Sequence, residues 1–306
     1  MGVDTRLHPR EHPVHLGLRR PDERVAVGER RLELGLIERE ALVGGEALDE
    51  VLLRAVLAHV DAWFEREMPG PETQALFALA NELRIGFCLG YAELAVEDGV
   101  VHRYNTAILV DKSGQIVAKY RKVHLPGHAE HEPWRKFQHL EKRYFEPGKA
   151  FGVTDAFGGV IGMAICNERR WPETYRVMGL QGVEMVLIGY NTPSVNSLKS
   201  AEGLQQRLLH NRLSAQAGAY QNSCWVVAVA KAGVEDGHHL IGGSLIVNPD
   251  GEIVAEAATE GDEVLVVPCD LDATRFGKQT IFDFARHRRV EHYGLITSRT
   301  GAVPPD

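Results

Sequence analysis

The sequence predicts an α/β fold in which helices cover the faces of β-sheets. Apolar runs of strand type alternate with segments of helical periodicity, and turn sequences join neighbouring strand-type runs. The chain has 306 residues, of which 44% are hydrophobic and 25% are charged, so it can bury a sizeable core. Residues 63–306 contain no linker or internal repeat, and we expect them to form one domain.

The first elements of this domain follow from residue spacing. A helix is expected over 71–83, because apolar residues recur at helical intervals and Pro71 suits a first turn. A strand is expected over 85–94. The run TAILVDKSGQIVAKY (106–120) indicates two strands joined by a turn at 112–114.

The later elements alternate in the same way. Short continuous apolar runs are typical of buried strands, and longer segments with apolar residues three and four apart are typical of helices. Helices are expected from Pro172 and over 204–220, and strands over 159–166, 184–191, 223–233, 242–257 (with a turn at 248–251) and 262–271.

Residues 1–62 have a different composition from the rest. They contain no Lys, Asn, Gln, Ser, Phe, Tyr, Trp or Cys, whereas residues 63–306 use all of these types. Apolar residues at helical spacing favour helices over 32–42 and 48–60. One interpretation is an arginine-rich helical extension. The other hypothesis is a stretch translated out of frame, which the coding DNA would decide.

Composition and charge exclude several classes of protein. The formal net charge of −8 disfavours nucleic-acid binding. No apolar run approaches the roughly 20 residues of a membrane span, and the chain does not start with the apolar segment of a secretory signal. The four cysteines form no CxxC pair, which favours free thiols in a reducing compartment. We therefore expect a cytoplasmic protein that binds neither nucleic acid nor membranes.

Cys166 is the first candidate for catalysis. It ends a strand-type run, and Pro172 opens a helix shortly after it. Ligands and nucleophiles gather at such strand ends in α/β sheets, and helix amides or nearby cations stabilise the reactive thiolate. The alternative is a buried inert cysteine, which is how we interpret Cys88, Cys224 and Cys269.

Two further segments carry ionisable side chains. Lys119 and Lys122 end a strand, and a cation beside a thiol can stabilise an oxyanion. His139 and Glu141 are two residues apart, so on an extended chain they face the same side and can orient a base or a polar substrate. The alternatives are an ordinary solvated strand end and a solvated loop with a turn at 147–148.

Other chemistries find no support in the sequence. Four histidines lie close together within 124–139, but Pro126 and Gly127 break any helix that would align them, and no zinc-type pairing is present. No glycine-rich nucleotide loop precedes a helix, and GGS at 242–244 is not the GxSxG elbow of serine hydrolases. We expect neither a metal nor a nucleotide site.

Taken together, these segments resemble the nitrilase superfamily of carbon–nitrogen hydrolases, and most closely its N-carbamoyl-D-amino acid amidohydrolase branch, the D-carbamoylases. The cysteine and lysine segments indicate the superfamily, and the segments around FQHLEKRYFEPG and CNERRW indicate the branch. The matching segments run in order from about Glu67 to Ile296: EMPGP, GYAEL, YNTAILVDKSGQIVAKYRKVHLPGH, FQHLEKRYFEPG, AICNERRWPE, YRVMGL, GYNTP, QAGAYQN and EHYGLI.

The resemblance implies a nitrilase-like four-layer α-β-β-α sandwich and a Glu–Lys–Cys triad. Cys166 matches the nucleophile, and Lys122 matches the lysine that stabilises the developing oxyanion. Glu141 matches a second glutamate that supports substrate placement. Since the family needs no metal or organic cofactor, none is expected here.

Substrate-binding residues follow from the same motifs. The backbone N–H of Asn167 would complete the oxyanion hole, and Arg169 and Arg170 match the arginines that hold the amino-acid carboxylate. His139 and Asn191 match positions that line the pocket. The implied partner is a small-molecule N-carbamoyl amino acid, and the implied assembly is a homo-oligomer, a dimer or a tetramer.

The chain departs from the family pattern near its N-terminus. The family's first strand carries a Pro-Glu whose glutamate is the general base, and counting back from EMPGP places it near Leu42. Glu40 and Glu46 lie nearby, but no strand-like run ends in Pro-Glu, so neither is assigned as the base. The first strand and helix of the sandwich are not recognisable either. An out-of-frame 5′ end would explain both observations.

The expected reaction is hydrolysis of N-carbamoyl-D-amino acids to the D-amino acid, CO2 and ammonia through a carbamoyl-enzyme on Cys166. One alternative is another carbon–nitrogen hydrolase: a β-ureidopropionase, an amidase or a nitrilase. The adjacent Arg169 and Arg170 favour an anionic substrate over a neutral one. The other alternative is an impaired relative without the triad glutamate, which binds carbamoyl amino acids or assembles with active subunits.

Overall fold

The computed structural model describes residues 60–199, 201–235 and 237–304. The chain divides into two units, Met1–Ala62 and Trp63–Asp306, and the second contains the sheets and helices described below. The expected helix over 32–42, nearly all of that over 48–60, and both interpretations of the N-terminal segment concern residues outside those described. None of the described helices is long and apolar enough to cross a membrane.

The first sheet is an antiparallel meander with the order β1-β2-β3. Its strands are Phe87–Glu97, Val100–Val110 and Ile116–Arg121. The expected turn between β2 and β3 is present: Asp111 accepts hydrogen bonds from the backbone N–H groups of Ser113 and Gln115, and Gly114 has a φ of +79°. These local bonds help to set the register of β2 and β3, in which Arg121 at the end of β3 lies opposite Thr106.

The second sheet is mixed, with the order β11-β10-β7-β6-β5-β4. Its three central strands, β5, β6 and β7, are parallel, which explains why their sequences are continuously apolar. A separate ribbon is formed by β8 (Val234–Glu235) and β9 (His238–His239). The strands of the mixed sheet are β4 Val153–Ala156, β5 Gly159–Ile165, β6 Met185–Tyr190, β7 Trp225–Ala230, β10 Leu245–Val247 and β11 Ile253–Glu256.

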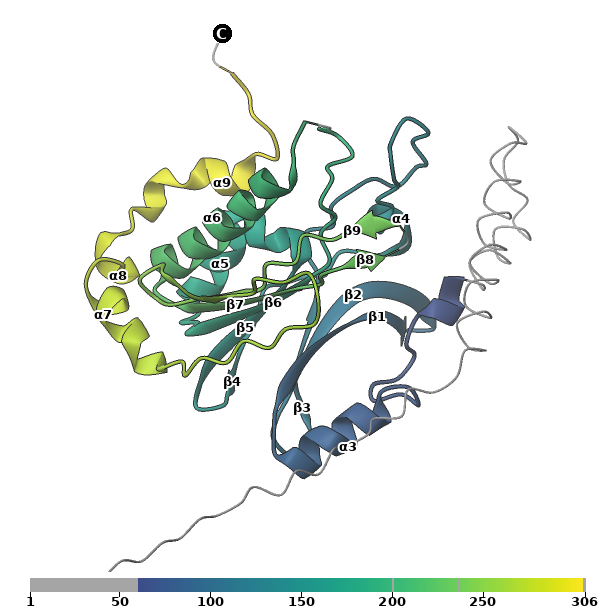
Figure 1. Ribbon diagram of the computed structural model, residues 1–306. Coiled ribbons are helices and arrows are strands. Elements are labelled where there is room, and N and C mark those ends of the chain that lie inside the picture. The colour runs from purple at the N-terminus through teal and green to yellow at the C-terminus, as the bar shows by residue number, and fades with distance from the viewer. Residues whose placement is uncertain (1–59, 200, 236, 305–306) are drawn as a thin grey trace, which may run out of the picture. The chain divides into compact units, whose positions relative to one another are not determined.

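Helices cover the outer faces of both sheets, which gives four layers in the order α-β-β-α (Figure 1). Helix α3 (Gln74–Leu83) lies on the first sheet, and α5 (Pro172–Leu180) and α6 (Leu204–Asn222) lie on the second. Gly218 lets α6 approach α5, because a Cβ there would come within 2.5 Å of the Tyr175 ring. The predicted sandwich is therefore confirmed in the part of the chain that the structure describes.

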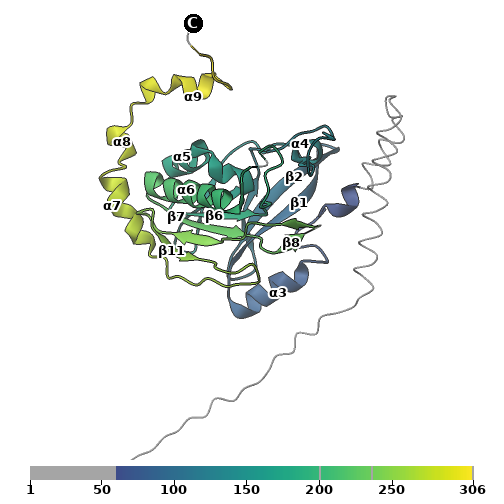
Figure 2. The ribbon, with the colours of Figure 1, turned by 45° about the horizontal axis from the view of Figure 1, so that its top comes forward.

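Short helices complete the chain. Figure 2 shows α7, α8 and α9 following one another along the outside of the domain. They are α4 Glu141–Tyr144, α7 Thr274–Gln279, α8 Phe284–His287 and α9 Gly294–Ser298, with short 3-10 helices at η1 Asp61–Trp63, η2 Cys166–Arg170, η3 Leu271–Ala273 and η4 Val290–His292.

Three apolar clusters hold the layers together, one at each contact between layers. The cluster between the two sheets includes Leu109 and Tyr120 from the first sheet and Ile161 and Met163 from the second. Burying such side chains contributes about 1.5–3 kcal/mol each, so the sheets pack as one body. Cys166 packs against both this cluster and the one beneath α5 and α6.

The outer face of the first sheet carries a buried ion cluster. Glu93 is 5% exposed and accepts hydrogen bonds from Lys119 (2.8 Å), Arg121 (2.8 and 2.9 Å) and Thr106 (2.7 Å). Burial alone would raise the pKa of the Glu93 carboxyl, but these partners lower that pKa to about 2. Lys119 therefore binds the structural carboxylate of Glu93, whereas Lys122 has a different partner, described below.

The strand expected over 262–271 is not formed, and that prediction was wrong. The segment has an irregular backbone, and the side chains of Val264 and Val266 are 86% and 85% exposed. A short apolar run becomes a strand only where a neighbouring edge satisfies its backbone groups. Within the described ranges, no strand pairs with this segment.

Candidate active site

Cys166 lies at the carboxyl end of the parallel strand β5, as the sequence predicted. Its φ is +51°, a left-handed conformation that costs a non-glycine residue about 1–2 kcal/mol. This conformation ends the strand abruptly and starts η2, which places the half-buried thiol at the strand end. Strain of this kind often accompanies functional positions and supports Cys166 as the reactive centre.

A fully buried carboxylate, Glu168, connects the Cys166 turn to the end of β3. One of its oxygens accepts the backbone N–H of Ile165 at 2.8 Å. The other accepts the backbone N–H groups of Val123 (2.9 Å) and His124 (3.1 Å) and the hydroxyl of Tyr120 (2.6 Å). The residue before Cys166 and the residue after Lys122 therefore bind the same side chain.

Lys122 forms a buried ion pair with Glu141. Its ammonium lies 2.5 Å from Glu141 Oε1, and the lysine is 1% exposed. Asn105 donates its side-chain amide to the same oxygen at 2.9 Å, and His139 Nε2 lies 3.4 Å from the other. The structure thus brings Lys122, Glu141 and His139 into one group and adds Asn105, which the sequence analysis missed.

Glu141 is held as an anion in this group. Burial raises the pKa of its carboxyl, but the hydrogen bond from His139, the charge of Lys122 and the bonds from Lys122 and Asn105 outweigh that effect. The net pKa is below the ordinary value. A fixed negative charge of this kind can orient the Lys122 ammonium toward one side of the site.

Arg169 points into the protein. Its guanidinium donates to the Cys166 carbonyl oxygen (2.7 Å), Asn211 Oδ1 (2.9 Å) and Thr192 Oγ1 (3.1 Å), and its carbon lies 4.0 Å from the centre of the Tyr190 ring. All of these acceptors are uncharged, and the residue is 2% exposed. Arg169 therefore fixes the Cys166 turn while leaving its positive charge unneutralised by these contacts.

The other residues predicted for substrate binding lie around this turn. Arg170 is exposed and donates to the Asn167 side-chain oxygen at 3.2 Å. Asn191 is exposed at the end of β6, next to Thr192, which binds Arg169. Asn167, Arg169 and Arg170 thus form a second group around Cys166. Glu168 joins this group to the one around Lys122.

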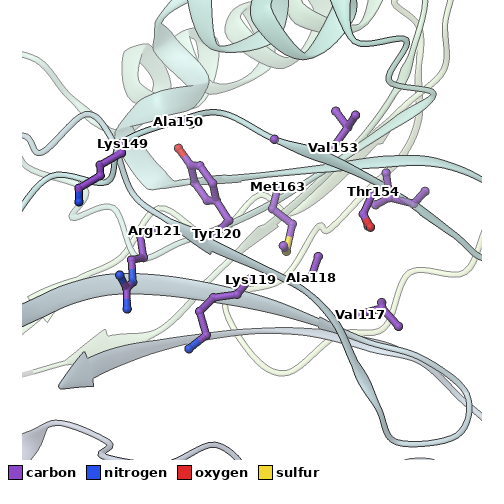
Figure 3. Close-up of a pocket in the computed structure, with 12 residues that line it drawn as sticks. Val117, Ala118, Lys119, Tyr120, Arg121, Lys149, Ala150, Val153, Thr154 and Met163 are labelled. Atoms are coloured by element: carbon purple, nitrogen blue, oxygen red, sulfur yellow. The ribbon is translucent and has the colours of Figure 1, made fainter. Parts of the chain in front are cut away.

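One cavity is separate from this site. It has a volume of about 590 Å³ and opens between β3, the segment before β4, and β5. Figure 3 shows Lys119 and Tyr120 leaving β3 in opposite directions at its wall. Of the candidate residues named from the sequence, Lys119 lines this cavity, whereas Cys166, Lys122 and Glu141 do not. Among the described residues, no group of three His, Cys, Asp or Glu side chains could hold a metal ion.

A four-layer α-β-β-α sandwich with a cysteine at a central strand end is the architecture of a nitrilase-type hydrolase. The sequence profile of the Carbon-nitrogen hydrolase family matches residues 41–279, and the chain belongs to this family. The protein is therefore a hydrolase that acts on carbon–nitrogen bonds.

Relatives support this assignment and its fold. N-carbamoylputrescine amidase of Arabidopsis thaliana is 32% identical over 256 residues, which are 80% of this chain and 80% of that protein. A carbon–nitrogen hydrolase from Helicobacter pylori G27 has a similar structure, with a TM-score of 0.64 at 24% identity over 74% of this chain and 76% of that chain. Nit3 of Saccharomyces cerevisiae, from branch 10 of the nitrilase superfamily, gives a TM-score of 0.57 at 25% identity, covering 72% of this chain and 71% of that chain.

Proposed function

We propose that this protein hydrolyses N-carbamoyl-D-amino acids to the D-amino acid, CO2 and ammonia, with Cys166 as the nucleophile. The observation that carries the proposal is the charge around that residue. Arg169 and Arg170 lie in the same turn, and Arg169 has only uncharged partners among its hydrogen bonds. An anionic substrate would find complementary charge beside the reacting sulfur.

Two steps would convert such a substrate. The Cys166 sulfur attacks the ureido carbon, and its proton passes to a general base. The C–N bond to the α-amino nitrogen then breaks as that nitrogen receives a proton, which leaves a carbamoyl thioester. Water attacks the thioester carbon, the C–S bond breaks, and the Cys166 sulfur takes back a proton. The carbamic acid that is released decomposes to CO2 and ammonia. The resemblance implies a glutamate base near Leu42, where the sequence has no Pro-Glu, so no residue is assigned to this role.

The buried pair supplies electrostatic stabilisation in this scheme. Lys122 Nζ and the backbone N–H of Asn167 would hold the oxyanion that forms during each attack. Glu141 keeps Lys122 in place through the 2.5 Å contact, and His139 contacts the opposite oxygen of Glu141 at 3.4 Å. His139 is exposed, so it can also meet the substrate.

Arg170 is better placed than Arg169 to bind the substrate carboxylate. The Arg169 donors are committed to three protein acceptors, whereas Arg170 is exposed and holds one bond of 3.2 Å. In this arrangement Arg169 shapes the turn and Arg170 contacts the substrate. Asn191, exposed at the end of β6, would line the same pocket.

The second candidate substrate class is a carbamoylated amine, because the Arabidopsis relative is named N-carbamoylputrescine amidase. Both classes share the ureido group and would use the same chemistry at Cys166. They differ in charge, since a carbamoylated diamine is a cation and a carbamoyl amino acid is an anion. The guanidinium groups of Arg169 and Arg170 favour the anion.

The test is ammonia release by the full-length protein from the D and L forms of N-carbamoyl amino acids, from N-carbamoylputrescine and from simple amides. We expect turnover of the D-ureido acids and its loss in Cys166→Ala. Faster turnover of N-carbamoylputrescine would contradict the substrate class. Turnover by Cys166→Ala would contradict the mechanism. Mass spectrometry should detect a carbamoyl adduct on Cys166 during turnover.

We also propose that the protein works in the cytoplasm as a homo-oligomer. Helices α5 and α6 present exposed apolar side chains on their outer faces, including Leu180 (48%), Leu209 (57%) and Leu213 (61%). Exposed apolar patches of this kind mark contact surfaces. Light scattering should give a dimer or tetramer mass, and Leu213→Glu should lower it.

A further inference from the structure

Arg207, in the first turn of α6, is a buried cation with unused hydrogen-bonding capacity. The residue is 9% exposed, and its Nε has no hydrogen-bond partner among the described residues. The hydrogen bond that Arg207 makes to Glu202 runs from Nη1 to Oε1 at 3.4 Å, which is long for a charged pair. A buried donor without a partner is costly to keep, so the site is incomplete as it stands.

The position of Arg207 on α6 directs it toward the Cys166 turn. Arg207 and Asn211 are four residues apart and belong to the same buried face of the helix. Asn211 binds Arg169, and Arg169 binds the carbonyl oxygen of Cys166. Helix α6 also packs directly against η2, which carries Cys166. Arg207 therefore lies beside the group that surrounds the nucleophile.

The charges in this region do not balance. The charge of Arg207 acts on Arg170. Burial lowers the pKa of the Arg207 guanidinium, the charges of Glu202 and Cys166 raise it and the charge of Arg169 lowers it, and the net pKa is below the ordinary value. The acidic residue beside them is Glu202, which also accepts a bond from Asn196 at 2.6 Å and lies 3.4 Å from His210 Nδ1. Among these described groups, the positive charge of Arg169 acts on both Arg170 and Arg207, and Glu202 is the carboxylate that acts on Arg170 and Arg207.

We propose that Arg207 binds a second carboxylate on the substrate, so that the preferred substrates are N-carbamoyl amino acids with an acidic side chain. This inference rests on the proposed function. Arg170 would hold the α-carboxylate and Arg207 the side-chain carboxylate, one on each side of the ureido group. Two negative charges on the substrate would match the two guanidinium charges that Glu202 leaves unpaired.

A purely structural role for Arg207 is the competing explanation. An arginine that only braces Glu202 would be expected to engage it through a short, two-pronged contact, as fork-shaped guanidinium–carboxylate pairs do. The single 3.4 Å contact and the unpartnered Nε differ from that geometry. Arg212, on the same helix, shows the ordinary surface pattern, with Nε 2.7 Å from Glu256 and the side chain 36% exposed.

The experiment measures binding to the full-length Cys166→Ala protein, in which the substrate stays intact. Calorimetry compares N-carbamoyl-D-glutamate with N-carbamoyl-D-glutamine, which has the same shape and one charge fewer. We expect the glutamate derivative to bind at least about tenfold more tightly. Adding Arg207→Gln should remove this preference and leave the affinity for the glutamine derivative unchanged. Arg207→Lys should retain part of the preference.

The controls separate the outcomes. Arg212→Gln in the same background should leave the preference intact, and retained binding of the glutamine derivative shows that each variant is folded. Equal affinity for the two compounds, or an equal loss of both in Arg207→Gln and Arg207→Lys, overturns the assignment of Arg207 alone. A protein that binds neither compound overturns the proposed function and this inference with it.

Discussion

The carboxylate of Glu168 accepts a 2.6 Å hydrogen bond from the hydroxyl of Tyr120, which joins the turn after β5 to strand β3 inside the molecule. Tyr120 is 5% exposed and Glu168 is fully buried. Burial and the negative charge of Glu168 raise the pKa of the Tyr120 hydroxyl, which keeps it a donor. The contact fixes the distance between the two candidate catalytic segments.

Replacing Glu168 should therefore damage stability and activity together. Glu168→Ala leaves one hydroxyl and three backbone N–H groups without their acceptor and should lower the free energy of unfolding by about 3–5 kcal/mol. Tyr120→Phe removes one bond and should cost about 1–2 kcal/mol. Urea unfolding measures both. A Glu168→Ala protein as stable as the parent would contradict this account.

Lys122→Met should abolish most of the activity. The change removes the cation proposed to hold the oxyanion and leaves the Glu141 carboxylate buried without its charged partner. We expect kcat to fall by about 10²–10³. The matched control is Lys119→Met, three residues earlier on β3, because the Lys119 side chain is 45% exposed and bound to Glu93. An equal loss of kcat in the two variants would remove the special role of Lys122.

The Glu93 cluster should make the free energy of unfolding depend on pH in the acidic range. The pKa of Glu93 is about 2 in the folded protein, below the ordinary 4.5, so its contribution is fully present above pH 4.5 and is lost as the pH falls toward 2. Glu93→Gln should lower the free energy of unfolding by up to about 3 kcal/mol at pH 7. The difference between variant and parent should shrink steadily below pH 4.5. A difference that stays constant from pH 7 to pH 3 would contradict the prediction.

The cysteines should differ in reactivity. Cys88 is exposed and Cys269 is half-buried, so the prediction of a buried cysteine is correct only for Cys224. Burial raises the pKa of the Cys224 thiol to about 12, and desolvation of the Cys88 sulfur, which lies 3.8 Å from Met163 Sδ, raises that pKa to about 11. Since the thiolate is the nucleophile, both should alkylate slowly. Iodoacetamide at pH 7.5 followed by peptide mass mapping should find Cys166 modified first and Cys224 only after unfolding. Earlier labelling of Cys88 would count against Cys166 as the reactive thiol.

Much of the fold could be predicted from the sequence, because most of its strands are buried between packed layers and therefore appear as apolar runs. The run 159–166 and the run 184–191 are continuous apolar segments, and they became β5 and β6. Residues 262–271 show a similar pattern and formed no strand, because periodicity reports what a segment can do and not whether a partner edge is present. Short strands such as β4 and β8 were missed for the opposite reason, since too few residues repeat.

The site was predictable in its residue types and less so in its contacts. The positions of Cys166 and Lys122 at strand ends follow from the chain itself. The sequence does not show that Arg169 points inward and Arg170 outward. Neighbouring residues of a tight 3-10 turn face different surroundings, and the sequence pattern does not say which one faces which. Glu168 could have been noticed as an acidic residue directly after the strand, but its four partners come from segments far apart in sequence or fixed by the turn.

The left-handed backbone at position 166 also affects how substitutions there change the thermal stability of the protein. A glycine there would relieve the steric conflict, so a Cys166→Gly protein should melt at a higher temperature than Cys166→Ala, which keeps the conflict and loses only the sulfur. The fold therefore carries a local backbone strain at this position, while the cysteine side chain gains packing against two apolar clusters that a glycine would lose.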